Sequence, residues 1–429
     1  MAYGPSAPAR TCGTAPYVRP SCTAGPVPVA RFGCLSLRAA GQPPRTSRRS
    51  HNPFVSTHTL HRRRGSALPY VSRRTAVIAT GWLAAAVVLV PTAGSAASAA
   101  EEDCFDRRTE PYTSVVDGHL HFRPFGGEAV PFREVVGYLK RTGVEHAGVF
   151  GIGQKLPVDS SCTYYLDCPG TPVLPSMKND VVNAENVVEH KQEDVDLALS
   201  MTYPDLAHPG TVMDGMRLLD REFPGMFQWM GEVNLIKQAL LPNKHEPADE
   251  ADIREWAPFM DELRRRDMPI TIHSDLGNDQ DPTRYLHLME RVLRLYPQNK
   301  IVWAHMGLSK ELSAMDPDEH IALMERLLEA YPNLTLDLSW RVLEDMYFGK
   351  PGVREKYAAL FDAYPEQAIP GTDFVASRDK DFGVYKEELE VTSRINKAMG
   401  DEAFRRIALG QNYFDLLGIK KRAPEICEA

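Results

Sequence analysis

Two histidines separated by one residue, His119 and His121, follow a short apolar run at 114–116. In an extended strand, residues i and i+2 project from the same face, so both imidazoles can point at one position. Such a pair suits a divalent metal ion with tetrahedral or trigonal-bipyramidal coordination. The pair is a weak signal by itself, and its value depends on whether further ligands stand at the ends of other strands.

Other side chains that can bind a metal do stand at the ends of apolar runs along the chain. The end of a strand is where barrel enzymes carry their chemistry. Five such strand ends are hard to explain by packing, because buried histidines and carboxylates are costly without partners. After His119 and His121, the candidates are Glu232, His273, His305 and Asp373.

The elements that must hold these residues alternate between short apolar strands and amphipathic helices. The expected strands are 114–117, 146–151, 196–201, 228–234, 270–273, 301–305, 334–338 and 368–373. The expected helices, in which apolar residues recur at three and four positions, are 132–141, 181–192, 212–223, 253–266, 285–295, 321–330 and 353–364. This order predicts an α/β fold, a (β/α)8 TIM barrel in a single domain, with a helical C-terminal extension at 384–417. A doubly wound open sheet is the alternative, but no Gly-rich loop follows the first strand.

Charge separates the first 100 residues from the rest of the chain. Residues 1–100 contain 12 Arg and no Asp or Glu, whereas residues 101–429 contain 37 Lys and Arg against 57 Asp and Glu, a net charge of −20. So acidic a region argues against nucleic acid or an anionic membrane as a partner. We expect a small-molecule substrate, and the sequence gives no indication of oligomeric state.

The first 100 residues divide into two parts. Residues 1–70 lack a hydrophobic period and form either a disordered leader or an over-extended reading frame. Residues 71–100 resemble a signal peptide, with Ser72-Arg73-Arg74, an apolar stretch at 76–90 and the small residues Ala97-Ser98-Ala99. The basic start is also similar to a twin-arginine signal. We therefore expect export to the periplasm or the extracellular space, with 101–429 as the mature domain. An uncleaved anchor is the alternative, although the stretch is shorter than the roughly 20 residues of a membrane span.

Four cysteines follow residue 100, in a chain expected to reach an oxidising compartment. Three pairings are open. Cys162 and Cys168 lie in one loop, where a local bridge forms easily, and Cys104 and Cys427 lie at the two ends of the domain, which a closed barrel brings together. Free thiols or a metal site are the alternative, although Cys-x5-Cys lacks the usual zinc spacing.

The motifs together resemble the amidohydrolase superfamily, specifically its amidohydrolase-related branch of metal-dependent TIM-barrel hydrolases. The resemblance covers about residues 114–418. It rests on Asp117-Gly-His-Leu-His121, Ile272-His273, Ala304-His-Met-Gly307, Gly371-Thr-Asp373 and the closing Gly410-Gln-Asn412. As an ordered set these motifs are specific for the superfamily and do not identify a substrate.

The resemblance implies a role for most of the candidates. It makes His119, His121 and His273 ligands of a first metal ion, and Asp373 the carboxylate that contacts this ion and accepts a proton from the bound water. His305 would polarise the substrate in a one-metal site or bind the second ion in a two-metal site. The implied cofactor is one or two divalent ions, zinc before manganese, iron or nickel.

Glu232 departs from the family pattern, because many two-metal relatives carry a carbamylated lysine on the fourth strand. Lys237 lies too far along the chain to take that place. Three interpretations of Glu232 stay open: a bridge between two ions, a residue that orients a ligand or substrate in a one-metal site, or a structural carboxylate paired with a base.

Further residues near the strand ends are weaker candidates. Asp275 shares a strand face with His273 and either supports it or caps a loop. Arg341 either clamps a substrate carboxylate or forms a surface ion pair. The remaining candidates for substrate binding are Trp340, Arg123 and Lys155.

Three functions are compatible with these residues. The first is hydrolysis of an ester, lactone, amide or phosphoester by metal-activated water, with Asp373 handling the proton. The second is metal-dependent non-oxidative decarboxylation at the same site, which Arg341 would favour. The third is a non-catalytic exported binding protein, which the intact ligand set disfavours.

Overall fold

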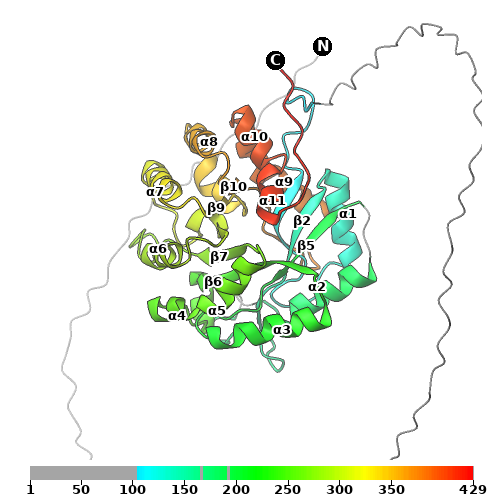
Figure 1. The fold of residues 1–429 in the computed structure, drawn as a ribbon, viewed down its shortest axis with the longest axis vertical. Helices are drawn as coiled ribbons and strands as arrows, with labels where there is room; N and C mark the ends of the chain where they lie inside the picture. Colours follow the sequence, from blue (N-terminus) through cyan, green and yellow to red (C-terminus); the bar gives the residue numbers. More distant parts are fainter. Residues whose placement is uncertain (1–103, 165–167, 191–193, 429) are drawn as a thin grey trace, which may run out of the picture. The chain divides into compact units, whose positions relative to one another are not determined.

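A ring of helices surrounds a central group of strands (Figure 1). The structure, a computed structural model, describes residues 104–164, 168–190 and 194–428. The predicted leader and signal segments, 1–70 and 71–100, lie outside the described residues. All described residues belong to one compact unit. No helix among them combines the length and the hydrophobicity that a membrane span requires.

A parallel sheet forms the centre of the fold, with its strands in the order β10-β9-β8-β7-β6-β5-β2-β1-β11. Their bounds are β1 (Val116–His121), β2 (His146–Phe150), β5 (Asp196–Met201), β6 (Phe227–Ile236), β7 (Ile270–Ser274), β8 (Ile301–Trp303), β9 (Leu334–Asp337), β10 (Ala368–Ile369) and β11 (Phe374–Val375). The first strand extends further than predicted, so that both histidines of the pair lie within it.

The last two strands, β10 and β11, are parts of one segment that is interrupted at 370–373. On one side of this segment the amide of Leu338 donates to the carbonyl of Ile369 at 2.9 Å. On the other side the amide of Gly118 donates to the carbonyl of Pro370 at 2.9 Å. The segment therefore bonds to both β9 and β1, the two ends of the strand order. The predicted α/β TIM barrel is confirmed.

Amphipathic helices cover the outside of the sheet and bury their apolar faces against it, as α6 does with Leu288, Met289, Val292 and Leu293. Their bounds are α1 (Phe132–Thr142), α2 (Lys178–Glu189), α3 (Val212–Glu222), α4 (Glu250–Glu255), α5 (Ala257–Arg265), α6 (Leu286–Leu295), α7 (Pro317–Ala330) and α8 (Arg354–Ala363). The single helix predicted at 253–266 is wrong, because two helices occupy this stretch. Pro258 lies in the first turn of α5, where a residue without an amide hydrogen is tolerated, and it cannot continue the hydrogen bonds of α4.

The C-terminal extension contains α9 (Phe382–Thr392), α10 (Asp401–Ile407) and α11 (Gln411–Leu417), and α11 closes one end of the barrel. Gly410 precedes α11 with φ 86°, and a Cβ at this position would lie 2.4 Å from the Val116 side chain. Tyr413 and Phe414 then pack into an apolar cluster inside the barrel. We call this cluster the barrel floor: Val116, Phe150, Ala198, Trp229, Val302, Ile369, Tyr413, Phe414 and Leu416.

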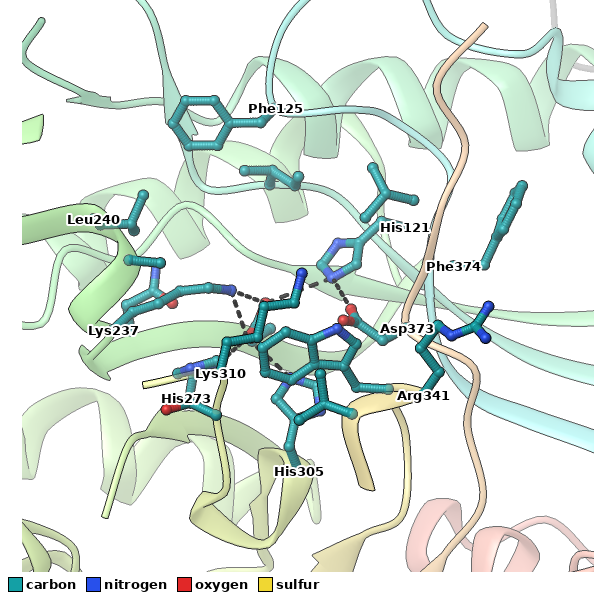
Figure 2. A pocket seen from close by; sticks show the side chains of 18 of the residues that line it. His121, Phe125, Lys237, Leu240, His273, His305, Lys310, Arg341, Asp373 and Phe374 are labelled. Carbon is teal, nitrogen blue, oxygen red and sulfur yellow. Dashed lines mark hydrogen bonds and ion pairs between the residues drawn. The ribbon is translucent and has the colours of Figure 1, made fainter. Parts of the chain in front are cut away.

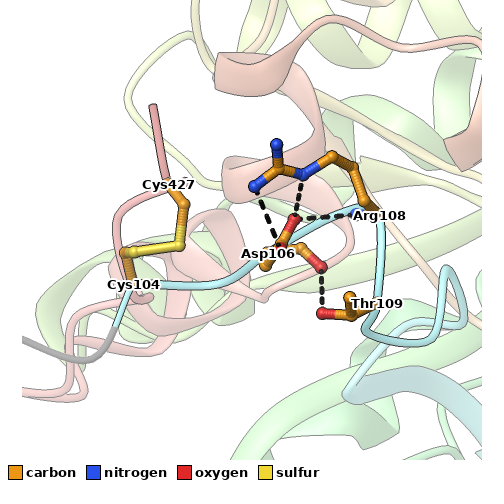
Figure 3. The surroundings of a disulfide bond; sticks show 5 residues. All are labelled: Cys104, Asp106, Arg108, Thr109 and Cys427. Atoms are coloured by element: carbon orange, nitrogen blue, oxygen red, sulfur yellow. Dashed lines mark hydrogen bonds and ion pairs between the residues drawn. A yellow bond between two sulfur atoms is a disulfide. The ribbon is translucent and has the colours of Figure 1, made fainter. Parts of the chain in front are cut away.

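Two disulfide bonds are present in the described residues. Cys104 and Cys427 are joined with their Cα atoms 5.0 Å apart, as Figure 3 shows. Next to this bond the amide of Phe105 donates to the carbonyl of Glu425 at 2.8 Å, so the two ends of the domain lie side by side. Cys162 and Cys168 form the second bond. It lies between the short antiparallel strands β3 (Gln154–Lys155) and β4 (Leu174–Pro175) of the long connection after β2.

Candidate metal centre

His119 and His121 turn the same ring nitrogen toward one place at the end of β1. Both are buried, with 1% and 3% of their surface exposed. His119 donates its Nδ1 hydrogen to Asp337 Oδ2 at 2.6 Å, and His121 donates its own to the carbonyl of Gly151 at 2.6 Å. The two Nε2 atoms lie 3.2 Å apart. Because each ring proton is used at Nδ1, both Nε2 atoms present lone pairs to the same small space.

Asp337 and Ser339, which the sequence analysis did not single out, hold two of the histidines from the end of β9. Asp337 is fully buried, and the Ser339 hydroxyl donates to its Oδ2 at 2.9 Å. His305 Nδ1 lies 3.0 Å from Ser339 Oγ and 3.3 Å from the Ser339 carbonyl oxygen. The sequence did contain a signal for Asp337, because it is an acid at the end of an apolar strand, like the other candidates.

Two carboxylates face the Nε2 atoms of the histidine pair. Asp373 Oδ1 lies 3.3 Å from His121 Nε2 and 3.6 Å from His119 Nε2. Glu232 Oε2 lies 3.5 Å and 4.0 Å from the same two atoms. Figure 2 shows His121 and Asp373 pointing at each other inside a cavity. An ionised carboxylate only accepts hydrogen bonds, so four acceptor atoms converge here.

The second oxygen of Glu232 faces the other two histidines. Oε1 contacts His273 Nδ1 and lies 3.8 Å from His305 Nε2. His273 donates its Nε2 hydrogen to Asp275 Oδ1 at 2.9 Å, so its Nδ1 turns a lone pair toward Glu232. A contact between two acceptors needs a proton or a cation between them. The two oxygens of Glu232 thus divide the four histidines into two pairs.

The electrostatics of this cluster favour positive charge. Burial lowers the pKa of His121, but its hydrogen bonds with Asp373 and Glu232 outweigh burial and raise the pKa to about 9, so that a proton at Nε2 supplies the positive charge that a metal ion would replace. Burial raises the pKa of Glu232, but the charges of Lys237 and His273 outweigh it and hold the pKa well below its ordinary value. The pKa of Asp373 is lowered in the same way, mainly by its hydrogen bond with His121. Both carboxylates therefore stay ionised and require cations nearby.

Lys237 supplies one such cation to Glu232. Its Nζ lies 3.1 Å from Oε1 and 3.3 Å from Oε2. Lys237 does not take the place of a lysine ligand at the strand end, but it reaches the glutamate that stands there. Glu232 is thus paired with a base, and it also lies between two histidine pairs. This geometry is compatible with two of the interpretations from the sequence at once, the structural carboxylate paired with a base and the bridge between two ions.

Three groups of ligand atoms could each hold a metal ion, with the atoms of each group within 4.8 Å of one another. The expected set of His119, His121 and His273 is not among these groups, because His273 faces the other oxygen of Glu232. Imidazole nitrogen and carboxylate oxygen are the donors that zinc and other first-row divalent ions bind, so the residues fit one or two such ions. The groups are His119-His121-Glu232, Glu232-His273-His305 and His119-His305-Asp373.

The backbone around these ligands adopts conformations that residues with a Cβ rarely take. His305, Met306, Trp340 and Asp373 have φ values of 54°, 55°, 73° and 54°. Such strain persists only where the surrounding structure holds it, and it gathers at functional sites. Gly371 provides the close approach that brings the interrupted strand to β1, because a Cβ there would lie 2.8 Å from the Cβ of His119.

A cavity of about 430 Å³ opens over the ligands. We call this end of the barrel the mouth. The cavity is lined by five of the six candidate ligands, all except His119. Trp340 also lines it, with its ring centroid 5.0 Å from that of His305. The described residues that line the cavity do not include Arg123 or Lys155.

The sequence analysis left two interpretations open for Arg341 and two for Asp275, and the contacts of the two residues differ. Arg341 lines the cavity, but it forms ion pairs with Asp345 at 2.9 Å and with Glu387 and Glu388 at 3.4 Å each. The structure shows these ion pairs at the cavity wall, and a role of Arg341 as a clamp for a substrate carboxylate stays a prediction. Asp275 performs both of its suggested tasks, since it accepts from His273 and also from the amide of Gln238 at 2.7 Å.

Comparison with known proteins places the chain in a family. The model of the amidohydrolase family matches residues 116–410. No curated protein matches the chain. Among solved structures, a zinc-bound amidohydrolase from Burkholderia multivorans is 13% identical, covering 71% of this chain and 98% of that chain with a TM-score of 0.45. Dihydroorotase from Campylobacter jejuni is 15% identical, covering 72% and 84% with a TM-score of 0.41. The match over 116–410 spans more than half of the sequence, and the chain belongs to the amidohydrolase family, whose enzymes are mostly metal-dependent hydrolases.

Proposed function

We propose that the chain is a metal-dependent hydrolase that cleaves an ester, lactone, amide or phosphoester bond with activated water. The observation that carries this proposal is the placement of the histidine ring nitrogens. Each of the four histidines has one ring nitrogen at a protein hydrogen-bond partner and turns the other toward Glu232 or Asp373. So many lone pairs in one buried space are costly without a cation. Membership of the amidohydrolase family supports the same reaction class.

The residues fit two divalent ions, zinc as the first choice, and Glu232 would contribute one oxygen to each. His119 and His121 would hold one ion together with Oε2 of Glu232, and Asp373 would add a further oxygen. His273 and His305 would hold the other ion with Oε1. Divalent ions in such a centre lower the pKa of a bound water toward ~7 and polarise the bond to be cleaved.

Asp373 is the residue best placed to carry the proton. Its side chain is 17% exposed and lines the cavity, whereas the side chain of Glu232 is 6% exposed. The hydrogen bond with His121 and the charge of His305 keep its pKa low, so it begins the reaction ionised. It can accept a proton from water and return it to the leaving group.

Decarboxylation is the weaker candidate. The feature that favoured it in the sequence was Arg341, as a clamp for a substrate carboxylate. Three acidic side chains already occupy the guanidinium of Arg341. The occupied guanidinium removes the feature that favoured decarboxylation, and membership of the amidohydrolase family supports hydrolysis.

Metal analysis of the purified protein tests the centre itself. We expect about two divalent ions per chain, and we expect His119→Ala to lose metal and turnover together. His208→Ala is the matched control, because His208 is exposed and pairs with Asp205 at 2.9 Å, outside the ligand cluster. Full activity in His119→Ala would rule out the proposed centre.

A substrate panel tests the reaction class. Lactones, aryl esters, amides, phosphoesters and aromatic carboxylates would be incubated with the metal-loaded protein, with acid release and CO₂ release followed side by side. Acid release from one of the first four classes supports hydrolysis. CO₂ release without acid release would replace the proposal with decarboxylation.

We also propose that the protein is exported. The two disulfide bonds support this, because such bonds persist mainly in oxidising compartments. Fractionation of cells that produce the full chain should give a shorter product outside the cytoplasm, beginning near residue 101. A full-length product that stays in the cytoplasm with free thiols would contradict export.

A further inference from the structure

Many charged side chains line the cavity, and its net charge depends on whether metal ions are bound. The basic ones are Lys237, Lys310, Arg341 and Lys380. The acidic ones are Glu232, Asp275, Glu311, Asp345, Asp373 and Glu388. Counting only Lys, Arg, Asp and Glu, four positive and six negative groups give −2, and two divalent ions held by neutral histidines would bring this to +2. A loaded cavity therefore favours a substrate that carries negative charge.

Lys310 and Lys380 differ from the other two basic side chains of the cavity, because among the described residues neither forms an ion pair with a carboxylate and each lies beside an aromatic ring, Trp340 for Lys310 and Phe374 for Lys380. Lys237 is paired with Glu232, and Arg341 is paired with three acids. Lys310 is exposed and lines the cavity, with its Nζ 5.6 Å from the centroid of the Trp340 ring. Within the part of the chain that the structure describes, no acid forms an ion pair with it.

The position of Lys310 relates it directly to the ligand cluster. Trp340 is a neighbour of both, since its ring centroid lies 5.0 Å from that of His305 and 5.6 Å from Lys310 Nζ. Figure 2 shows the Lys310 side chain extending into the cavity toward the ligands. The Lys310 ammonium group and the His305 ring therefore lie beside the same aromatic ring. A small substrate is long enough to reach both the ammonium group and the ligand cluster.

Two buried polar groups in the same cavity also lack partners. Ser309, next to Lys310, is 1% exposed, and its hydroxyl has no hydrogen-bond partner among the described residues. Asn234 is 6% exposed, and its Oδ1 likewise has none in that part of the chain. Both line the cavity. An unpaired buried polar group costs about 1–3 kcal/mol, so polar atoms of a bound molecule are the expected partners.

The rest of the cavity wall is apolar. Phe125 and Leu240 belong to a small apolar cluster that Ile152 joins, and all three line the cavity. Phe374 lines the cavity from β11. A ligand that fills this space needs an apolar body in addition to polar atoms.

Building on the hydrolytic function proposed above, we infer that the substrate is an ester, lactone or amide that carries a carboxylate on an apolar body, and that Lys310 binds this carboxylate. Asn234 binds a polar group nearer the ligand cluster. An ammonium contact of this kind is charge-assisted and therefore stronger than a neutral hydrogen bond.

Kinetics with two matched substrates test the inference. Phenyl acetate and 4-carboxyphenyl acetate differ only in the carboxylate, and we expect a higher kcat/KM for the second. In Lys310→Met the ratio of the two kcat/KM values should fall about tenfold, the effect of losing one charge-assisted contact. Lys310→Arg should keep the preference. Lys350→Met is the matched control, because Lys350 is also an exposed lysine beside an aromatic ring, 5.0 Å from Tyr347, and does not line the cavity.

Binding of an unreactive ligand separates this inference from the reaction itself. Calorimetric titration of the metal-loaded full chain with benzoate should show binding that Lys310→Met weakens about tenfold and Lys350→Met does not. Benzyl alcohol should bind more weakly than benzoate to the wild type. Equal binding of both ligands, or benzoate binding that is the same in Lys310→Met, would overturn the inference even if the protein hydrolyses neutral esters. Benzoate binding that depends on Lys310 would uphold it even if neither ester is cleaved.

Discussion

The two ends of the barrel differ in how their buried side chains are satisfied. At the floor, aromatic and aliphatic side chains satisfy one another, as Trp229 and Tyr413 do with ring centroids 5.8 Å apart. At the mouth, four imidazoles and two carboxylates crowd into a buried space where their lone pairs face each other. The floor is satisfied by its own side chains, whereas the mouth gathers the donor atoms of three candidate metal-binding groups.

The backbone shows the same division. Four residues of the mouth have a positive φ without being glycine, namely His305, Met306, Trp340 and Asp373. None of the nine floor residues does. Each such conformation costs roughly 1–3 kcal/mol. We infer that the packing of the floor contributes to the free energy of folding that offsets this cost. Substitutions at the mouth should therefore change function first, and substitutions at the floor should change stability first.

The largest effect is expected for Glu232→Gln at the mouth. The change keeps the size of the side chain but removes the charge that two histidine pairs and Lys237 share. Turnover should fall by more than about a hundredfold, since even residues that only support a metal ligand cost 10–100-fold when changed. Metal content, measured on the same preparation, should fall with it.

Glu311→Gln is the matched control for this prediction. Glu311 also lines the cavity, but it stands outside all three groups of candidate ligands. Metal content should be unchanged in this variant. If Glu232→Gln keeps its metal while Glu311→Gln loses it, the assignment of the bridging carboxylate is wrong.

Trp229→Ala is the corresponding test of the floor. The indole is fully buried and packs against Tyr413 and Phe150, with ring centroids 5.8 Å and 5.7 Å away. Its loss should lower the free energy of unfolding by about 3–5 kcal/mol, the usual cost of removing a large buried aromatic ring. Denaturant unfolding of the metal-free protein measures this directly. Metal stoichiometry at low temperature should stay that of the wild type, and a loss of metal without a loss of stability would break the division between the two ends.

Much of this arrangement could be predicted from the sequence, because it depends on position along strands. Metal ligands at the ends of apolar runs, alternating with amphipathic helices, were enough to predict a barrel with its chemistry at one end. The sequence could not show how the ligands group, because that depends on which oxygen of Glu232 each histidine faces. The direction in which each of these side chains points depends on contacts between different strands, and no spacing of residues along the sequence records it.

Asp337 shows a second limit of prediction. It supports His119 across 218 positions of sequence, and no motif connects the two residues. The sequence analysis also missed the interruption between β10 and β11, although Pro370 and Gly371 stand at the break. Tertiary contacts with β1 decide where that strand breaks. The contacts of Arg341 with three acids belong to the same class, because two of these acids come from a different helix.

The third prediction concerns pH and a residue that supports the mouth from behind. His320 is fully buried, donates its Nε2 hydrogen to the carbonyl of Met306 at 3.1 Å, and accepts at Nδ1 from the Tyr357 hydroxyl at 2.8 Å. The contact with Tyr357 requires a lone pair at Nδ1 and therefore the neutral ring; burial lowers the pKa of His320 to about 4, although the hydrogen bond to Met306 opposes this. Below about pH 6.5 the unfolded chain takes up a proton that the folded chain refuses, so stability is lost as the pH falls toward 4.

A comparison of wild type with His320→Gln isolates this effect. The stability advantage of the wild type should be largest above pH 7 and should shrink by about 3 kcal/mol on going to pH 4, at about 1.4 kcal/mol for each unit of pKa shift. Denaturant unfolding of both metal-free proteins at several pH values gives the difference. An advantage that grows as the pH falls would show that the ring is protonated in the folded protein.

The smallest effect comes from one chemical change made at both ends. At the floor, the Tyr413 hydroxyl is buried and has no partner among the described residues. Tyr413→Phe should leave the free energy of unfolding unchanged or raise it by up to about 1 kcal/mol, because no hydrogen bond is lost.

At the mouth, the Tyr385 hydroxyl donates to Asp117 at 3.1 Å, and Asp117 in turn accepts from the amide and hydroxyl of Thr372, the residue before Asp373. Tyr385→Phe leaves a buried carboxylate with one donor fewer and should cost about 1–3 kcal/mol. It should also lower turnover, because the backbone that presents Asp373 loses support. Thermal unfolding and kinetics of the two variants give the test. If both lose stability equally, the floor is not the self-sufficient end of this barrel, and the stability that holds the strained mouth must come from elsewhere in the fold.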